Sequence, residues 1–340
     1  MRDEHTRLLS RRSVLATGAG VAATGLAGCQ SSGDQGSDSV KIGVLAASPG
    51  NNPVGTGMQE GAQIAVDALN SNGGINDSTV EVIVKNTESS AQTARSVYQE
   101  LTLEEEVDFT TGVVNAEVLL ALMDEIANQE IPHFTTGALT PEASAMVSED
   151  YETYKYHFRA SLNGVFLGQA TTDFIAQKFP EYGWENVALL AVDTEDGVGL
   201  KNGIAGALGG MDNINVVIDA TFSPGTQNFN PLYDQAENNG ADVLLPLMVT
   251  PGSTAAVVQW ANSQRPFHFA GIHVPSQSPG FWQQTDGAAQ YTASTNASPQ
   301  EVEYTDKTQP FRSDYTEQFG GAPIFSAFAT YAGIQTFAQA

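Results

Sequence analysis

Residues 11–29 contain two cationic side chains, an apolar run and a thiol, in the order that export and lipid attachment require. Arg11 and Arg12 are adjacent and precede a Gly- and Ala-rich run over residues 14–27. This run is too short to span a bilayer, since a transmembrane helix needs about 20 apolar residues. It closes with Leu-Ala-Gly before Cys29, the only cysteine of the chain. The pattern is typical of a lipobox, in which the thiol carries a lipid.

We therefore predict a signal peptide of the twin-arginine (Tat) route over residues 1–28, which exports an already folded protein. Residues 29–39 are rich in Ser and Gly and predict a flexible tether. The mature protein is then expected outside the cell, on the outer face of the cytoplasmic membrane, held there through Cys29. A chance arginine pair beside an incidental cysteine is the alternative, but it requires three features to coincide in order and spacing.

Residues that would indicate catalysis or metal binding are missing at recognised spacings. The sequence has no P-loop, no Gly-x-Ser-x-Gly and no His-Glu-x-x-His. We therefore predict no catalytic residues, no cofactor and no enzyme. His268 and His273 would lie on opposite faces of a strand, and surface or loop positions are a better interpretation of them than a metal pair.

Two other patterns have weak functional interpretations. Gly55, Gly57 and Gly61 approximate a dinucleotide fingerprint with one residue too many, and they lie well beyond the preceding strand. Trp282, next to Phe281, would suit the rim of a binding crevice, but packing within a lobe is the commoner role of such a pair.

The charge of the chain excludes nucleic acid as a partner. From Cys29 onward there are 10 basic and 37 acidic residues, and the acidic ones are scattered rather than grouped in a tail. Self-repulsion of this size is screened at molar salt, where the Debye length is about 3 Å. We infer a salt-loving source, such as a haloarchaeon. An acidic surface that attracts a cationic solute is the alternative.

The elements that must position any site alternate between strand and helix. Short apolar runs predict strands, and apolar residues at helical spacing predict helices between them. The expected strands are residues 41–46, 80–85, 107–112, 131–135, 187–192, 216–221, 243–247 and 267–271. The expected helices are residues 58–69, 116–127, 164–179, 197–208, 227–239, 253–263 and 328–340. We expect Asn72-Gly73-Gly74 to end the first helix and the Asn115 side chain to cap the second. The alternation of strands and helices favours parallel βαβ units.

The order of these elements predicts an α/β protein with two doubly wound parallel-sheet lobes joined by a multi-strand hinge. About 300 folded residues are more than one core usually organises. We assign residues 40–153 and 298–340 to lobe 1 and residues 154–297 to lobe 2, with crossings at 154–160 and 291–297. The last helix has no stop signal, so we expect C-terminal residues, and a third crossing, beyond the present end.

The sequence resembles the branched-chain amino acid (Leu/Ile/Val) type of ABC-transporter solute-binding proteins. The resemblance is carried by KIGVL at residues 41–45, GAQIAVDALN at 61–70 and GGIN at 73–76. It implies the type I periplasmic-binding fold, with one crevice between two lobes at the carboxyl ends of their strands. Helix N-termini and unpaired loop N–H groups there would favour an anionic or carbonyl-bearing ligand.

The resemblance also implies which positions contact the ligand, although several residue types differ from those of the family. Asn115 and Ala116 stand where serines usually meet the ligand carboxylate, and Leu139 stands where a threonine does. The acidic loop at residues 193–197 lacks the family's tyrosine, and Thr250 lies near where an acid would bind an ammonium group. The full set of expected ligand-binding residues is Asn51, Asn115, Ala116, Gly137, Ala138, Leu139, Glu195, Asp196 and Thr250.

Because both ends of an amino-acid zwitterion have lost usual partners, an amino acid, an amide or a carboxylate is each compatible with the sequence. Glu195 or Asp196 would offer a contact to a cation, although a solvated loop charge is the simpler interpretation of each. The expected function is a solute-binding lipoprotein that delivers a small molecule to an ABC permease. The alternatives are a ligand-binding sensory lipoprotein that feeds a signalling partner and, less favoured, a secreted hydrolase.

Overall fold

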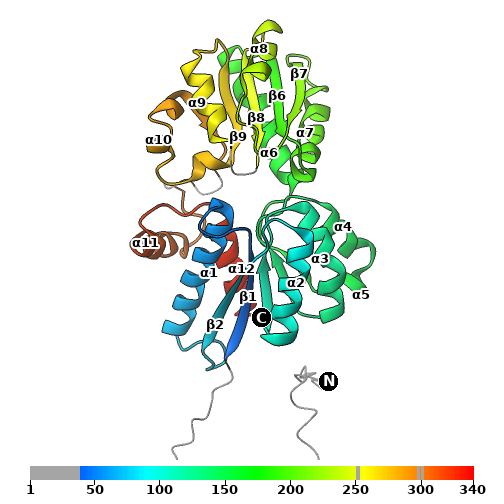
Figure 1. Ribbon diagram of the computed structural model, residues 1–340, viewed down its shortest axis with the longest axis vertical. Coiled ribbons are helices and arrows are strands. Elements are labelled where there is room, and N and C mark those ends of the chain that lie inside the picture. Colours follow the sequence, from blue (N-terminus) through cyan, green and yellow to red (C-terminus); the bar gives the residue numbers. More distant parts are fainter. Residues whose placement is uncertain (1–38, 250–252, 297–298, 300–301) are drawn as a thin grey trace, which may run out of the picture. The chain divides into compact units, whose positions relative to one another are not determined.

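The computed structural model describes residues 39–249, 253–296, 299 and 302–340. In this part of the chain the strands form two parallel sheets with helices against them (Figure 1). The strand orders are β2-β1-β3-β4-β5 and β10-β9-β8-β6-β7. The predicted α/β class with two parallel-sheet lobes is confirmed. Arg11, Arg12 and Cys29 lie outside the described residues.

The first lobe is a sheet with apolar cores on both faces. One core joins strand residues to α1 and α12, and the other joins them to α2 and α3. The strands are β1 (Val40–Ala46), β2 (Val80–Asn86), β3 (Phe109–Gly112), β4 (His133–Thr135) and β5 (His157–Arg159). The helices are α1 (Pro53–Ser71), α2 (Ala91–Gln99) with its π-helical continuation (Glu100–Glu104), α3 (Ala116–Gln129), α4 (Glu142–Glu149), α5 (Tyr151–Tyr154), α11 (Thr308–Phe319) and α12 (Phe325–Phe337).

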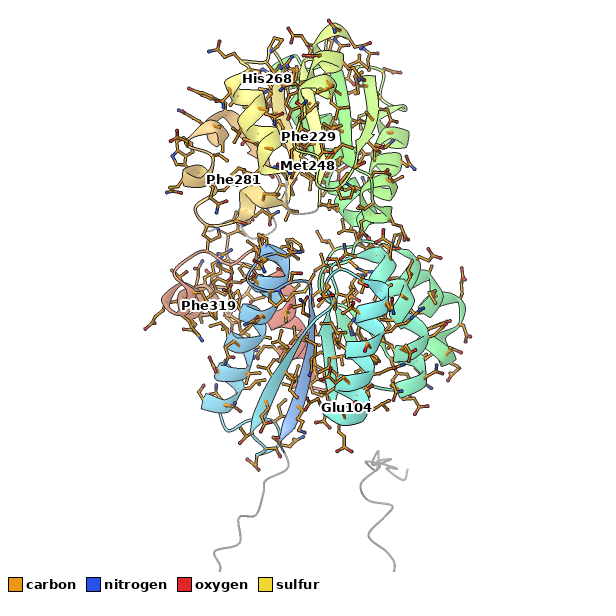
Figure 2. The ribbon with its side chains drawn as sticks, viewed as in Figure 1. Glu104, Phe229, Met248, His268, Phe281 and Phe319 are labelled. Atoms are coloured by element: carbon orange, nitrogen blue, oxygen red, sulfur yellow. The ribbon has the colours of Figure 1, made fainter. Side chains whose placement is uncertain are left out.

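The second lobe repeats this plan. Phe229 and Met248 belong to the core under α8 and α9, and a second core lies under α6 and α7 (Figure 2). The strands are β6 (Asn186–Val192), β7 (Asn215–Phe222), β8 (Val243–Met248), β9 (His268–His273) and β10 (Thr292–Ser294). The helices are α6 (Gly164–Tyr182), α7 (Glu195–Leu208), α8 (Asn230–Asn238), α9 (Thr254–Asn262) and α10 (Phe281–Gln284), with 3-10 turns at Val274–Gln277 and Ala288–Tyr291. No helix among the described residues is both long and apolar enough to cross a membrane.

The segments expected to cross between the lobes are edge strands instead. Within residues 154–160, β5 pairs in parallel with β4 of the first sheet. Within residues 291–297, β10 pairs in parallel with β9 of the second sheet. Each strand satisfies backbone groups of its neighbour, and the chain leaves the sheet only after that strand.

The start and end of α1 follow directly from the sequence. The Asn52 side chain accepts a hydrogen bond from the Val54 amide at 2.9 Å, and Pro53 occupies the first turn. After the helix, Gly73 and Gly74 have φ angles of 97° and 82°, a region that glycine occupies without strain. The predicted Gly-Gly stop signal is therefore confirmed.

The Gly55, Gly57 and Gly61 pattern is explained by packing. A Cβ at Gly57 would lie 2.6 Å from the Ser326 hydroxyl oxygen, and one at Gly61 would lie 2.3 Å from the carbonyl oxygen of Ala327 on α12. These glycines let α1 approach α12 and the loop after β1 more closely than any side chain would permit. They lie within α1, so they form no phosphate-binding turn.

Gly61→Ala should lower the free energy of unfolding by about 2 to 3 kcal/mol, because the new methyl group would overlap the backbone of α12. Gly203→Ala is the matched control, since it makes the same change at an exposed position of α7. No other atom lies within 4 Å of the Cβ that it would add. The control should be neutral or stabilising by about 0.5 to 1 kcal/mol. Urea unfolding of both variants measures the difference, and equal stabilities would contradict the packing role of Gly61.

A buried pair of histidines lies on two neighbouring strands of the first sheet, β4 and the edge strand β5. His133 lies on β4 and His157 on β5, with ring centroids 6.2 Å apart. The His133 Nδ1 atom is 3.0 Å from the Thr110 hydroxyl, and the His157 Nε2 atom is 3.0 Å from the Thr135 hydroxyl. Burial lowers the pKa of His157 to about 4, and burial, His157 and Arg159 hold the pKa of His133 well below 6.5. Both rings are therefore neutral at pH 7.

Candidate functional site

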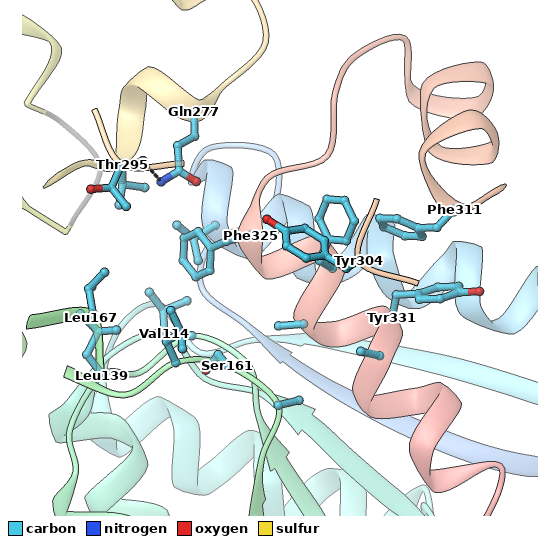
Figure 3. A pocket seen from close by; sticks show the side chains of 18 of the residues that line it. Val114, Leu139, Ser161, Leu167, Gln277, Thr295, Tyr304, Phe311, Phe325 and Tyr331 are labelled. Atoms are coloured by element: carbon cyan, nitrogen blue, oxygen red, sulfur yellow. Dashed lines mark hydrogen bonds between the residues drawn. The ribbon is translucent and has the colours of Figure 1, made fainter. Parts of the chain in front are cut away.

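A cavity of about 540 Å³ lies where strands of both sheets end (Figure 3). Its walls include residues that follow β3, β4, β5, β8, β9 and β10, together with Asp196 in the first turn of α7. Ligands commonly bind at the carboxyl ends of parallel strands, because loops and helix N-termini converge there. The cavity also extends along α11 and α12, where Phe311, Phe325 and Tyr331 line it.

The lining is largely apolar but contains hydrogen-bonding atoms without partners. Val114, Leu139 and Leu167 gather on one wall (Figure 3). Among the described residues, the buried side-chain atoms that line the cavity and lack a hydrogen bond are Asn115 Oδ1, Ser161 Oγ and Gln277 Oε1. The amide nitrogen of Gln277 is held by the Thr295 carbonyl at 3.1 Å. Buried polar atoms are normally paired, so these three atoms are candidates for contact with a ligand.

The side chain of Asp196, on the second lobe, hydrogen-bonds to two loops of the first lobe. Its Oδ2 atom accepts a hydrogen bond from the Ala116 amide at 2.9 Å, and its Oδ1 atom accepts one from the Leu139 amide at 3.0 Å. Burial raises the pKa of Asp196 to about 6, and these two bonds oppose the rise. The expectation of unpaired N–H groups awaiting a ligand is therefore wrong at these two positions.

Arg159 holds the loop after β4 in place. Its guanidinium donates to the carbonyl oxygens of Ala138 at 2.5 Å and Thr140 at 2.8 Å. Burial lowers the pKa of Arg159 and the Asp196 carboxylate raises it. The arginine thus fixes the loop on both sides of Leu139, whose amide is turned toward Asp196.

Asn115 occupies the predicted position before α3 but does not perform the predicted capping. Its side chain makes no hydrogen bond to the first turn of the helix. The Asp196 carboxylate takes the Ala116 amide instead, and a carboxylate is favoured at a helix N-terminus. The Asn115 side chain is consequently left at the cavity.

The other expected ligand-binding residues have different placements. Gly137, Leu139 and Asp196 line the cavity with Asn115, whereas Ala116 and Ala138 are fully buried. Glu195 is exposed, as the solvated-charge interpretation predicts, and its backbone amide donates to Glu117. Asn51 is exposed and lines a second hollow, which Glu60 and Tyr315 also line. Thr250 lies outside the described residues.

Several residues that line the cavity were not predicted from the sequence. Ser161 follows β5 by two residues, Thr295 follows β10 directly, and Gln277 follows β9 after one turn. All three lie beyond the carboxyl ends of strands, where ligands commonly bind. The sequence predicts crossings between the lobes at β5 and β10, so Ser161 and Thr295 were not expected to line a site. The aromatic wall from α11 and α12 carries no such signal, because its residues are spaced like any packed helix.

The aromatic and histidine candidates lie outside this cavity. Phe281 (labelled in Figure 2) is buried in the second lobe's core, as the packing interpretation predicts. Trp282 is half exposed and lines a third hollow. His268 is exposed, whereas His273 is buried, so the surface or loop position expected for His273 is wrong. The ring of His273 packs against Phe269 and Phe281 at the end of β9. Among the described residues, no three His, Cys, Asp or Glu side chains are grouped to hold a metal ion.

Comparisons with known proteins agree with this architecture. A family model described as periplasmic binding protein matches residues 39–340. No curated protein matches the chain in sequence. A similar solved structure is the substrate-binding protein LivJ of a branched-chain amino acid transporter from Streptococcus pneumoniae, in complex with isoleucine. It is 21% identical with a TM-score of 0.74, over 89% of this chain and 83% of that one.

Two solute-binding proteins of ABC transporters from Rhodopseudomonas palustris are also similar. The one in complex with benzoate is 17% identical with a TM-score of 0.73, over 88% of this chain and 79% of that one. The one in complex with 3,4-dihydroxybenzoic acid, from strain BisB5, is 16% identical with a TM-score of 0.68, over 89% of this chain and 80% of that one. At these identities the likeness establishes the type I periplasmic-binding fold.

Proposed function

Because the chain belongs to the periplasmic binding protein family, we propose that it is the solute-binding component of an ABC transporter. It captures one small molecule in the cavity between its lobes and presents it to a membrane permease. Closure of the lobes over the solute would give the permease a means to distinguish loaded protein from empty protein. Proteins of this family bind solutes without converting them, in agreement with the prediction that this protein is not an enzyme.

The observation that carries this proposal is the cavity itself. Its volume of about 540 Å³ falls in the range of small-molecule sites, and loops from both lobes line it. Unpartnered polar atoms from Asn115, Ser161 and Gln277 lie among apolar side chains, an arrangement that suits recognition of a small ligand. Solved proteins of the same fold bind isoleucine and benzoate, so compact molecules of that size are the first solutes to test.

A thermal-shift screen of the mature protein at high salt tests the proposal. The screen should cover amino acids, amides, carboxylates, alcohols, polyamines, sugars and nucleosides. A solute at about 100 times its Kd should add about 2.7 kcal/mol to the free energy of unfolding. A saturable rise for one chemical class supports solute capture, and no rise with any class contradicts it.

The proposal includes export by the Tat route and lipid anchoring at Cys29, which keep the protein at the outer face of the membrane. Cys29→Ser should move the protein from the membrane fraction into the medium, because a serine hydroxyl cannot receive the lipid. Ser32→Ala in the same tether is the control and should stay in the membrane fraction. Fractionation of producing cells and immunoblotting measure both variants, and membrane retention of Cys29→Ser would refute lipid anchoring.

A further inference from the structure

Two backbone N–H groups of the first lobe converge on one carboxylate. We call this pair, from Ala116 and Leu139, the amide seat. Its bonds of 2.9 and 3.0 Å go to different oxygens of Asp196, so both oxygens of that carboxylate are engaged. The seat lies at the N-terminus of α3, where the helix dipole favours an anion, and Arg159 adds positive charge. Its two N–H groups bind one carboxylate, and in this protein that carboxylate is Asp196.

The rest of the cavity offers little to a second anion. Asn115 Oδ1 and Gln277 Oε1 accept hydrogen bonds but cannot donate them, and the Ser161 hydroxyl can do either. Of the lining residues that the structure describes, Lys307 alone is a cation, and it is exposed to solvent. A carboxylate that entered the cavity would lose its hydration and gain only the Ser161 hydroxyl as a buried, unpaired side-chain donor among the described lining atoms, which is unfavourable. A group that donates hydrogen bonds would instead satisfy the orphan oxygens.

We propose that Asp196 determines specificity by filling the amide seat, so that the cavity takes neutral, largely apolar solutes that donate hydrogen bonds, such as carboxamides with a hydrocarbon body, and rejects carboxylates. This inference rests on the proposed function and names the solute class for it. Apolar side chains, including Val114, Leu139 and Phe325, would contact the hydrocarbon part. Asn115 Oδ1 and Gln277 Oε1 would accept from the N–H group of the solute.

Benzamide and benzoate are matched probes, because they share one ring and differ mainly in charge. Each is titrated calorimetrically into the wild type and into Asp196→Ala, at constant ionic strength and at a pH above the pKa of about 6 that burial gives Asp196. Asp196→Asn is a second variant that keeps the shape of the side chain but not its charge. Asp193→Ala is the control, since it removes an exposed carboxylate of the same loop that is not among the lining residues. Circular dichroism confirms that each variant is folded.

Benzoate should bind Asp196→Ala about 10- to 100-fold more tightly than it binds the wild type, because the vacated amide seat can then accept its carboxylate. Asp196→Asn should also gain affinity for benzoate, because it removes the negative charge that repels the carboxylate. Asp193→Ala should bind benzoate as weakly as the wild type. The inference is overturned if neither Asp196 variant gains benzoate affinity, or if the wild type already binds benzoate more tightly than benzamide. Its failure is separable from that of the proposed function, which fails if the wild type binds no solute in the screen.

Discussion

Asn115→Ala should weaken binding of the solute about 10- to 100-fold, which corresponds to one lost hydrogen bond in a desolvated site. The Asn115 Oδ1 atom is buried at the cavity and has no partner within the described chain. In the empty protein this unpaired oxygen is a cost, so its removal should leave the free energy of unfolding unchanged or slightly raised. Calorimetric titration with the best solute from the screen, and urea unfolding without it, measure the two effects.

The second hollow provides the comparison for this experiment. Asn51 is exposed there, on the loop after β1, and carries the same side chain. If the solute bound in that hollow, Asn51→Ala would reduce the affinity and Asn115→Ala would not. That outcome would contradict the assignment of the cavity as the binding site.

The protein should lose stability as the pH falls from about 6.5 to about 4, because its buried histidines stay neutral in the folded chain and take up protons only when the chain unfolds. The pKa of His157 falls from 6.5 to about 4 on folding, and that of His273 falls to about 4, both mainly through burial. Below pH 6.5 the unfolded chain therefore binds more protons than the folded chain, and the folded state is progressively disfavoured. At about 1.4 kcal/mol per pKa unit, each histidine removes about 3 kcal/mol across this range.

Asp196 acts in the opposite direction. Its pKa rises from 3.8 to about 6 on folding, so the folded chain binds the extra proton as the pH falls through 6, and this contribution stabilises the fold toward pH 4. Burial also raises the pKa of Glu60 and of Glu195, which act in the same direction as Asp196. His133, also held neutral by burial, acts with the other two buried histidines, and we expect their combined effect to make the net slope a loss. The same carboxylate that shapes the site therefore partly offsets the acid sensitivity of the core.

Urea unfolding at a series of pH values between about 7 and about 4, at constant salt, measures this slope. His157→Asn removes the titrating ring and should flatten the loss by about 3 kcal/mol over that range, whatever its stability at neutral pH. His268→Asn is the control, because it removes an exposed histidine outside the buried pair. Equal slopes for the wild type and His157→Asn would refute the assignment.

The long, strongly periodic elements were predictable from the sequence. The expected helix at residues 58–69 lies within α1, and strands such as β1 and β6 differ from their predictions by one residue at most. Their signals are strong because each buries a continuous apolar stripe or run in a sheet core. By contrast, α2 buries only Ala94 and Tyr98, and α5 buries no residue. Such helices have too few buried apolar positions for a helical periodicity to be detected in the sequence.

The candidate site was predictable only in part. The family resemblance located Asn115, Gly137, Leu139 and Asp196, all of which line the cavity. The sequence could not reveal that Asp196 reaches two amides of the other lobe, since that contact spans 80 residues to Ala116 and depends on how the chain folds. The partners of Asp196 are backbone amides, which every residue except proline has, so no residue type in the sequence marks them. For the same reason the expected cap from Asn115 is replaced by a carboxylate distant in sequence.

Solute capture in the cavity between the lobes is tested most directly by isothermal titration of the best screened solute into the wild-type protein at several temperatures. We expect saturable binding of one solute per chain, with a negative heat-capacity change because the apolar lining is removed from water. Binding that does not saturate, more than one solute per chain, or a heat-capacity change near zero would contradict solute capture in this cavity.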